Sequence, residues 1–241
     1  IKTPLTSIIN YVDLIKKERP EGKIEEYTEI LDRQSNRLKK LLDDLLEASK
    51  ASTGNISVEL SKTNVGELVN QAVGEYSERL EKSGIDLIVT LPKEPTYIMA
   101  DGRKLWRIFD NILSNICKYS LPNTRAYADV VNKGENVVIS FKNISKEQLN
   151  IDSDELMERF VRGDSSRNTE GSGLGLNIAR SFAELQAAKF NLYIDGDLFK
   201  AEIIFKRVPA DEVKAEPQTF DNSDSTDNTG NTDGADNTEK Q

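Results

Sequence analysis

A seven-residue hydrophobic repeat in the first 50 residues limits the possible folds of this chain more than any other feature. From residue 24 onward an apolar or aromatic side chain recurs at steps of three and four residues, and only Gln34 interrupts the series. Its members are Ile24, Tyr27, Leu31, Leu38, Leu41 and Leu45. This spacing predicts an α-helix with one apolar seam. Leu42 and Leu46 widen the seam beyond that of a simple coiled coil, as a four-helix bundle requires.

A shorter apolar series with the same steps precedes this helix: Leu5, Ile8, Val12 and Ile15. Residues 20–22 supply a turn, so residues 1–50 are predicted to form a helical hairpin. One hairpin cannot bury both of its apolar faces, and two copies would complete a four-helix bundle, so we expect a homodimer through residues 1–50. The alternative is a hairpin that packs on its own downstream domain. Pro4 predicts that the backbone of residues 1–4 is not regular helix.

Residues 56–208 carry a different pattern, in which short β-branched and aromatic runs alternate with amphipathic segments. The predicted strands are 57–60, 85–91, 96–100, 126–131, 136–141, 190–194 and 200–205, and the predicted helices are 65–82, 103–119 and 174–186. Lys133-Gly134 and Asp195-Gly196 predict two hairpin turns. Because strict β-α-β alternation is missing, the fold class is predicted to be α+β, with helices covering one face of a sheet.

Residues 209–241 are predicted to be a disordered acidic tail, because they contain almost no apolar side chains. The tail has nine acidic residues and two lysines, which accounts for −7 of the net charge of −9. A solvating tail is favoured over an interaction tail. The rest of the chain lacks the basic balance of a nucleic-acid-binding protein. No apolar run approaches the ~20 residues that span a bilayer, so we expect no membrane contact by this fragment.

The single cysteine and the absence of histidine restrict the chemistry further. An internal disulfide and a Cys/His metal cluster are both excluded. Cys117 lies in an apolar helix face and is predicted to be a small buried hydrophobe, in preference to a reactive thiol. The chain begins at Ile1 without a methionine, which we interpret as a cut N-terminus.

The predicted helix 103–119 carries two asparagines at a functional spacing. Asn111 and Asn115 are four residues apart, so their amides share one helix face, and Lys118 lies beside Asn115. An amide oxygen can bind Mg²⁺ while the ammonium offsets phosphate charge. The alternative is the polar face of a surface helix, but most residues beside the two asparagines are apolar.

A glycine-rich turn opens the predicted helix 174–186. Gly171, Gly173 and Gly175 lack Cβ atoms, which lets backbone N–H groups approach a phosphate at the helix N-terminus. The spacing matches neither the Walker A motif nor the dinucleotide-binding fingerprint. The turn therefore predicts a different kind of phosphate site.

Together these motifs resemble the transmitter region of two-component sensor histidine kinases, which joins a dimerisation hairpin to an ATP-binding α/β sandwich of the GHKL (Bergerat) type. Residues 2–6, Lys-Thr-Pro-Leu-Thr, resemble the phosphoacceptor motif, which implies a phosphoacceptor histidine two places before Ile1. Residues 110–120 resemble the N box and residues 170–176 the G2 box. Residues 155–164 resemble the F box, and an ATP lid would follow it. The resemblance covers residues 1–208 and implies a hairpin domain (1–50) and a catalytic domain (56–208).

The resemblance also implies roles for single residues. Asn115 would be the principal Mg²⁺ ligand, with Asn111 beside it, while Lys118 and Tyr119 would line the nucleotide. The G2-box residues that would hold the phosphates are Gly171, Gly173, Leu174, Gly175 and Leu176. Arg162 would reach the γ-phosphate, although a surface salt bridge is the alternative.

Thr3 would orient a water for phosphatase activity, four residues after the expected histidine. The alternative role for Thr3 is N-capping of the first helix.

The adenine box departs from the family pattern. Relatives have Asp-x-Gly-x-Gly, whose Asp accepts a hydrogen bond from the adenine amino group, whereas here Asn143 stands at the Asp position and both glycines are missing. An Asn carbonyl can still accept from an amine, but it is neutral. The resemblance therefore implies a weaker contact with the base.

As a whole, the resemblance implies an ATP-dependent protein-histidine kinase. The γ-phosphoryl group of ATP would pass to the histidine and then to an aspartate of a response-regulator receiver domain, and the same protein would act as a regulator phosphatase. ATP and Mg²⁺ are the expected cofactors. The fragment is expected in the cytoplasm, as part of a membrane sensor. Two alternatives are an ATPase or chaperone of the GHKL superfamily, against which the Lys-Thr-Pro-Leu-Thr hairpin argues, and a non-catalytic dimeric scaffold, which only the altered adenine box supports.

Asn143 predicts that this chain discriminates ATP from GTP less well than a relative with Asp at this position. The variant Asn143→Asp is expected to recover that selectivity. A neutral hydrogen bond contributes about 0.5–1.5 kcal/mol and one to a charged group about 1.5–3 kcal/mol, so the substitution is expected to raise selectivity about tenfold. A competition titration of ATP against GTP measures it. Strong rejection of GTP by the native chain, unchanged in Asn143→Asp, would show that Asn143 does not read the base.

Overall fold

The computed structural model describes residues 2–18, 22–52, 56–149, 156 and 173–208. Contacts divide the chain into a unit of residues 1–209 and a unit of residues 210–241. The predicted acidic tail lies outside the described residues.

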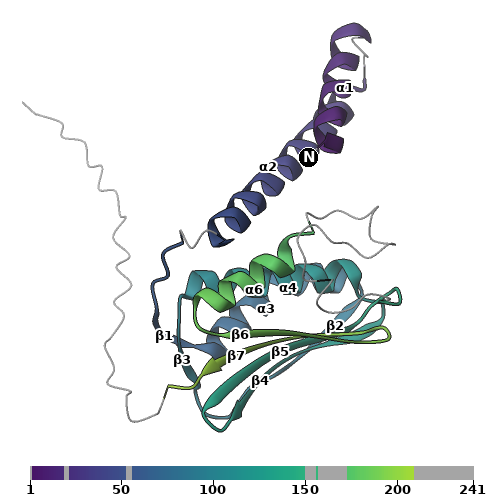
Figure 1. Cartoon of the computed structure of the whole chain (residues 1–241). Helices are drawn as coiled ribbons and strands as arrows, with labels where there is room; N and C mark the ends of the chain where they lie inside the picture. Colours follow the sequence, from purple (N-terminus) through teal and green to yellow (C-terminus); the bar gives the residue numbers. More distant parts are fainter. Residues whose placement is uncertain (1, 19–21, 53–55, 150–155, 157–172, 209–241) are drawn as a thin grey trace, which may run out of the picture. The chain divides into compact units, whose positions relative to one another are not determined.

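Two antiparallel helices form the predicted hairpin, α1 (Lys2–Glu18) and α2 (Ile24–Ser52) (Figure 1). Gly22 adopts a φ of 86° in the turn, a conformation that favours glycine. The rings of Tyr11 and Tyr27 meet edge to face at 5.3 Å between centroids, so they join the two helices near the turn.

The expectation of irregular backbone at residues 1–4 was wrong for the residues described, because α1 already begins at Lys2. Pro4 lies in the first turn of the helix, where backbone N–H groups have no intrahelical acceptor. The missing N–H of proline therefore costs no hydrogen bond there.

A five-stranded sheet forms the base of the second domain, in the order β2-β4-β5-β7-β6. Its strands are β2 (Ile85–Thr90), β4 (Thr124–Lys133), β5 (Asn136–Ile144), β6 (Lys189–Asp195) and β7 (Leu198–Lys206). The β2–β4 pair is parallel and the other pairs are antiparallel. Gly134 and Gly196 have φ of 60° and 62°, at the two predicted hairpin turns.

A separate two-stranded sheet pairs β1 (Ser61–Asn64) with β3 (Tyr97–Ala100). The predicted strand at residues 57–60 was wrong, because the first strand starts only at Ser61. Its register opposite β3, with Ser61 facing Ala100, is set by a partner far away in the sequence. Local β-propensity does not contain that information.

Three helices cover one face of the five-stranded sheet: α3 (Val65–Lys82), α4 (Gly102–Tyr119) and α6 (Gly175–Leu185) (Figure 1). The side chain of Asn64 caps α3, and that of Asp101 caps α4 by accepting from the Lys104 N–H at 3.1 Å. The rings of Phe109 and Phe141 lie 5.5 Å apart and connect α4 to β5.

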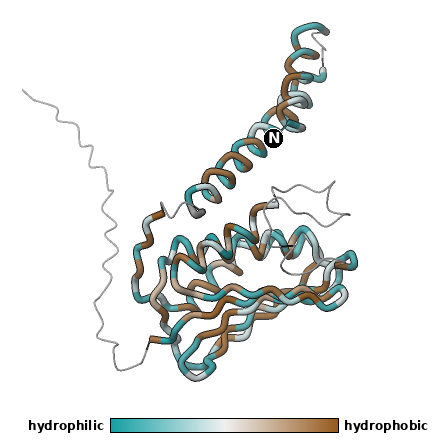
Figure 2. Tube along the Cα trace, viewed as in Figure 1, coloured by the Kyte–Doolittle hydropathy of each residue, from teal (hydrophilic) through white to brown (hydrophobic). Residues whose placement is uncertain are grey.

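The α+β class with helices on one sheet face is confirmed. Figure 2 shows hydrophobic segments along the strands and helices of this layer and along both hairpin helices. Within the described part of the chain, no helix is both long and apolar enough to cross a membrane.

Candidate nucleotide-binding site

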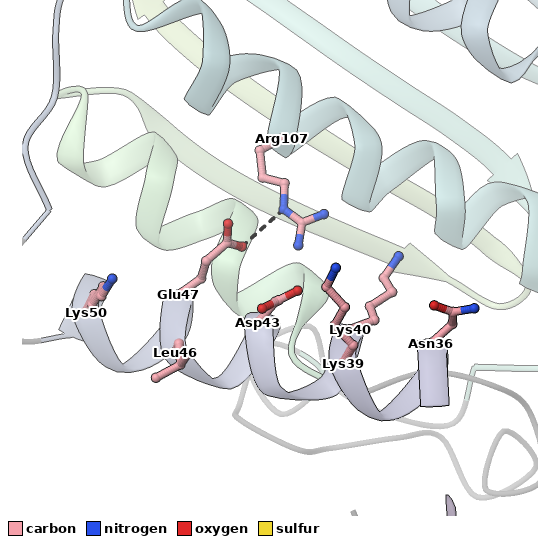
Figure 3. A pocket seen from close by; sticks show the side chains of 8 residues that line it. All are labelled: Asn36, Lys39, Lys40, Asp43, Leu46, Glu47, Lys50 and Arg107. Carbon is pink, nitrogen blue, oxygen red and sulfur yellow. Dashed lines mark hydrogen bonds and ion pairs between the residues drawn. The ribbon is translucent and has the colours of Figure 1, made fainter. Parts of the chain in front are cut away.

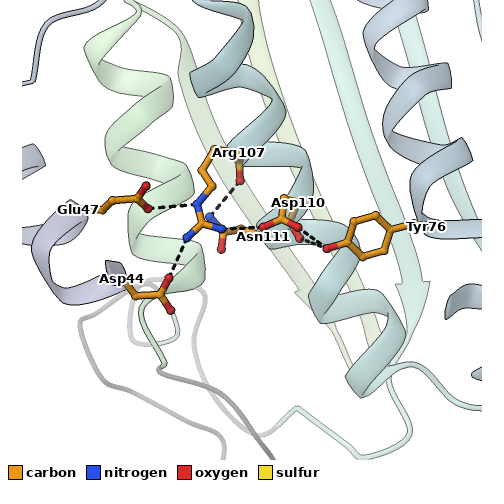
Figure 4. A network of polar contacts seen from close by, with 6 residues as sticks. All are labelled: Asp44, Glu47, Tyr76, Arg107, Asp110 and Asn111. Atoms are coloured by element: carbon orange, nitrogen blue, oxygen red, sulfur yellow. Dashed lines mark hydrogen bonds and ion pairs between the residues drawn. The ribbon is translucent and has the colours of Figure 1, made fainter. Parts of the chain in front are cut away.

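Helix α4 positions the predicted N-box residues because its apolar face is fixed in the core. Ile108, Ile112 and Leu113 are fully buried, and this orientation turns Asn111 into the domain with only 8% of its surface exposed. The Asn111 Nδ2 donates to the backbone carbonyl of Arg107 at 3.0 Å, which fixes the orientation of the amide (Figure 4).

The N box and the G2 box meet at Gly175. A Cβ atom on Gly175 would lie 3.1 Å from the Asn111 Oδ1, closer than ordinary van der Waals contact. A side chain at position 175 would make this amide shift by a few tenths of an ångström, so glycine favours the close approach of α6. Gly173, just before α6, has a φ of 72°, which also favours glycine. The two motifs that sequence reasoning assigned to Mg²⁺ and phosphate are thus side by side.

The adenine-box strand ends beside the C-terminal end of α4. Asn143 is 5% exposed and, two residues after the buried Phe141, lies on the helix-covered face of β5. The Lys146 N–H donates to the carbonyl of Tyr119 at 2.8 Å, and the Lys146 ammonium donates to the carbonyl of Lys118 at 3.1 Å. These bonds hold the segment after Asn143 against the two residues predicted to line the nucleotide.

The other residues predicted to contact the nucleotide differ in how deeply they are buried. Asn115, Lys118, Tyr119 and Leu176 are half-buried. Leu174 is 1% exposed and belongs to the hydrophobic core. Gly171 and Arg162 lie outside the described residues, as do nearly all of the F box and the lid.

Thr3 lies apart from these residues, on the exposed side of α1. It lines a surface hollow of about 430 Å³ together with Lys2, Thr6, Ser7, Asn10 and Tyr11. N-capping by Thr3, the alternative role, is wrong because Thr3 is already inside the helix.

Sequence reasoning missed an ion-pair cluster around Arg107. The guanidinium donates from Nη2 to Asp44 at 2.8 Å, from Nε to Glu47 at 3.1 Å and from Nη1 to Asp110 at 2.7 Å (Figure 4). Asp44 and Glu47 belong to α2, so the cluster joins the hairpin to the second domain. The sequence feature that could have indicated this cluster is Arg107 itself, which lies between the apolar residues Leu105 and Ile108 of a predicted core helix.

The same cluster borders a hollow of about 560 Å³ between α2 and α4 (Figure 3). Lys39, Lys40 and Lys50 line this hollow with Asp43 and Glu47. It is separate from the asparagines of the N box.

Asp110 extends the cluster to α3, since the Tyr76 hydroxyl donates to its carboxylate. Burial raises the pKa of Tyr76, and the hydrogen bond to Asp110 raises it further, so the phenol keeps its proton. Burial alone would lower the pKa of Arg107, but the carboxylates of Glu47, Asp110 and Asp44 raise it above its ordinary value. Cys117 is half-buried against the core and not fully buried as predicted, and this burial raises its pKa and keeps the thiol protonated.

The donor set of the site fits a Mg²⁺-nucleotide in its chemistry. Within the described ranges, no group of three or more acidic, Cys or His side chains could hold a metal ion. Amide oxygens are suitable ligands for a hard cation that is also bound by substrate phosphates. Asn111, with its fixed amide beside the glycine turn, and Asn115, one turn further along α4, provide such oxygens.

Comparisons with known proteins identify both parts of the chain. Residues 1–54 match the family described as the His Kinase A (phospho-acceptor) domain. Residues 100–219 match the family described as the histidine kinase-, DNA gyrase B- and HSP90-like ATPase. The chain is thus the transmitter region of a sensor histidine kinase, as the motifs predicted.

Particular relatives agree with this assignment. The sensor protein VanS of Enterococcus faecium is 32% identical over 187 residues, which are 75% of this chain and 47% of VanS. The chain spans about half the length of the two sensor proteins VanS and VanSC that it matches. Among solved structures, the histidine kinase AdeS of Acinetobacter baumannii has a TM-score of 0.70 at 16% identity, with 85% of this chain and 95% of AdeS covered. Histidine kinase ThkA, solved in complex with response regulator protein TrrA, has a TM-score of 0.66 at 18% identity over 86% of this chain and 58% of ThkA. At these identities, both structures support the fold alone.

Gly175→Ala is expected to weaken nucleotide binding about tenfold without unfolding the domain. The new methyl group would press on the Asn111 amide, which its own hydrogen bond and burial prevent from moving away. Titration with a fluorescent ATP analogue measures the affinity. Gly74→Ala in α3 is the matched control, because a Cβ there meets open space, and it is expected to stabilise the fold by about 0.5–1 kcal/mol. Unchanged affinity in Gly175→Ala would contradict the close approach of the two boxes.

Proposed function

We propose that the chain is the catalytic part of an ATP-dependent protein-histidine kinase in a two-component system. The observation that carries the proposal is the contact between the Asn111 amide and Gly175, which brings an N box and a glycine-rich helix start into one site. The γ-phosphoryl group would pass from ATP to the histidine expected two places before Ile1 and then to an aspartate of a receiver domain.

Mg²⁺ is proposed to bind at Asn115 together with the nucleotide phosphates. Asn115 lies one helical turn beyond Asn111 on the same side of α4 and is partly accessible. Lys118, three residues further, supplies positive charge for the phosphates. When bound, the ion would offset the charge that develops during phosphoryl transfer.

Adenine recognition is proposed at Asn143, at the opposite end of this site. Its burial on the helix-covered face of β5 and the bonds from Lys146 to the end of α4 support this role. Arg162 and the lid are proposed to complete the phosphate side.

A response-regulator receiver domain is the proposed partner of α1. The hollow beside Thr3 is lined by hydroxyl and amide side chains on an exposed helix face, which suits a polar protein partner. ThkA, a structural relative, was solved with a response regulator. Thr3 is proposed to orient a water for dephosphorylation of that regulator, and the whole protein is proposed to be a membrane-bound sensor.

A homodimer through the hairpin is proposed to complete a four-helix bundle. Leu42, Leu45 and Leu46 on α2 and Leu5 and Ile9 on α1 are exposed in the single chain. Exposed apolar side chains that recur along one side of a helix are typical of an interface. A second copy of the hairpin, whose seam has the same residues, would cover them.

Asn115→Ala and Asn115→Asp are expected to lower Mg²⁺-dependent phosphoryl transfer at least about 100-fold, because a metal ion supplies several kcal/mol of transition-state stabilisation. The assay follows radiolabelled phosphate from ATP in a longer chain that restores the expected histidine. Asn70→Ala, at an exposed position of α3, is the control and should retain activity. Transfer at the native rate in both Asn115 variants would refute the assignment.

Leu46→Glu is expected to weaken the dimer about tenfold or more. Leu46 is 56% exposed in the single chain, so a charge there should spare the hairpin fold but would be buried in the bundle. Light scattering across a dilution series measures the dissociation constant. Arg33→Glu, on the opposite side of α2, serves as the control. A dissociation constant that does not change in Leu46→Glu would place the dimer interface elsewhere.

A further inference from the structure

Helix α2 presents different side chains on its two sides near its C-terminal end. Leu42, Leu45 and Leu46 form the exposed apolar side. With about 100° per residue, Asp44 and Glu47 fall on the other side of the helix. Ala48 is 3% exposed and belongs to the same core cluster as residues of α4 and α6. The second side of α2 is therefore a docking surface for the ATP-binding domain.

Charge dominates this docking surface. One guanidinium, that of Arg107, contacts three carboxylates from two helices, and the side chains of Asp44 and Asp110 are only 6% and 14% exposed. Loss of the guanidinium would remove the ion pairs that Asp44 and Glu47 make with α4 and would increase the mutual repulsion of the three carboxylates. Such an arrangement is unfavourable in a partly dry interface. The positive charge of Arg107 therefore stabilises docking in this geometry.

If α2 were released from the ATP-binding domain, Arg107 would keep one of its three partners. Asp110 belongs to the same helix, and the Tyr76 hydroxyl holds its carboxylate in place. Asp44 and Glu47 would return to water on release. The cation is thus never left buried and unpaired, so undocking avoids the largest electrostatic penalty.

We infer that Arg107 is the electrostatic clasp that holds the ATP-binding domain on α2, through Asp44 and Glu47, and that its neutralisation releases the domain. The clasp lies one helical turn from Asn111, whose amide donates to the Arg107 carbonyl. The docking contact at Arg107 and the N-box residue Asn111 are therefore joined within α4, one helical turn apart. The inference concerns domain position and goes beyond the proposed kinase activity.

Thiol accessibility at position 48 tests the clasp. In a Cys117→Ser background, Ala48→Cys places a single thiol at the docking surface, where it should react slowly with a maleimide. Arg107→Gln is expected to raise the labelling rate at least about tenfold, and so is the double variant Asp44→Asn/Glu47→Gln. Combining all three changes should add little, because both routes break the same contacts.

Matched controls come from the same helices. Arg103→Gln in α4 removes an arginine whose ion pair with Glu59 is exposed, and Asp43→Asn in α2 removes a carboxylate beside the cluster. Neither is expected to change the rate more than about twofold, given the small contribution of exposed pairs. If Arg103→Gln accelerates labelling as much as Arg107→Gln, general loss of charge and not the clasp controls docking.

The double variant on α2 protects the test against misfolding, since it leaves the sequence of the ATP-binding domain intact. Labelling of the double variant and of Arg107→Gln at the parent rate would overturn the inference, as would a parent thiol that reacts as fast as in urea. The assay needs neither ATP nor phosphoryl transfer. Failure of the proposed kinase function would therefore leave the labelling result unaffected.

Discussion

The packing of α4 onto the five-stranded sheet and against α6 is the interaction on which the rest of the structure depends. Its apolar side chains, including Ile108, Phe109 and Ile112, are fully buried and fix the rotation of the helix. Every polar residue of α4 is then directed by that rotation. Asn111 turns toward Gly175 of α6, Arg107 toward α2, and Asp110 toward Tyr76 of α3. One core helix thus connects nucleotide chemistry with domain contacts.

The polar groups around α4 are stabilised by partners that come from different parts of the chain. The Asn111 amide has lost most of its contact with water, and the Arg107 carbonyl compensates by accepting its N–H. Arg107 itself is compensated by three carboxylates. A partly buried ion-pair cluster adds little net stability over an apolar contact, but it tolerates few alternative arrangements. Its effect is therefore on which helix faces meet, and the hydrophobic core supplies most of the stability.

The sequence predicted the elements with strong periodicity well and those with weak periodicity poorly. The predicted helix 65–82 agrees with α3 at both ends, because the Asn64 cap and the apolar spacing are local signals. The first strand was placed four residues too early, because β1 has only four residues and takes its register from β3. The irregular backbone expected around Pro4 was wrong because proline is acceptable in the first turn of a helix.

The sequence by itself determined the chemical groups of the site. The spacing of Asn111 and Asn115 and the glycines at 173 and 175 follow from helix periodicity and backbone freedom, which are properties of short segments. Only the tertiary structure decided that Gly175 lies against Asn111, that the segment after Asn143 lies beside Tyr119, and that Arg107 reaches across to Asp44 and Glu47. These contacts join residues up to 64 positions apart in the chain. Packing of the helices on the sheet creates them, and no local pattern in the sequence specifies which helix faces will meet.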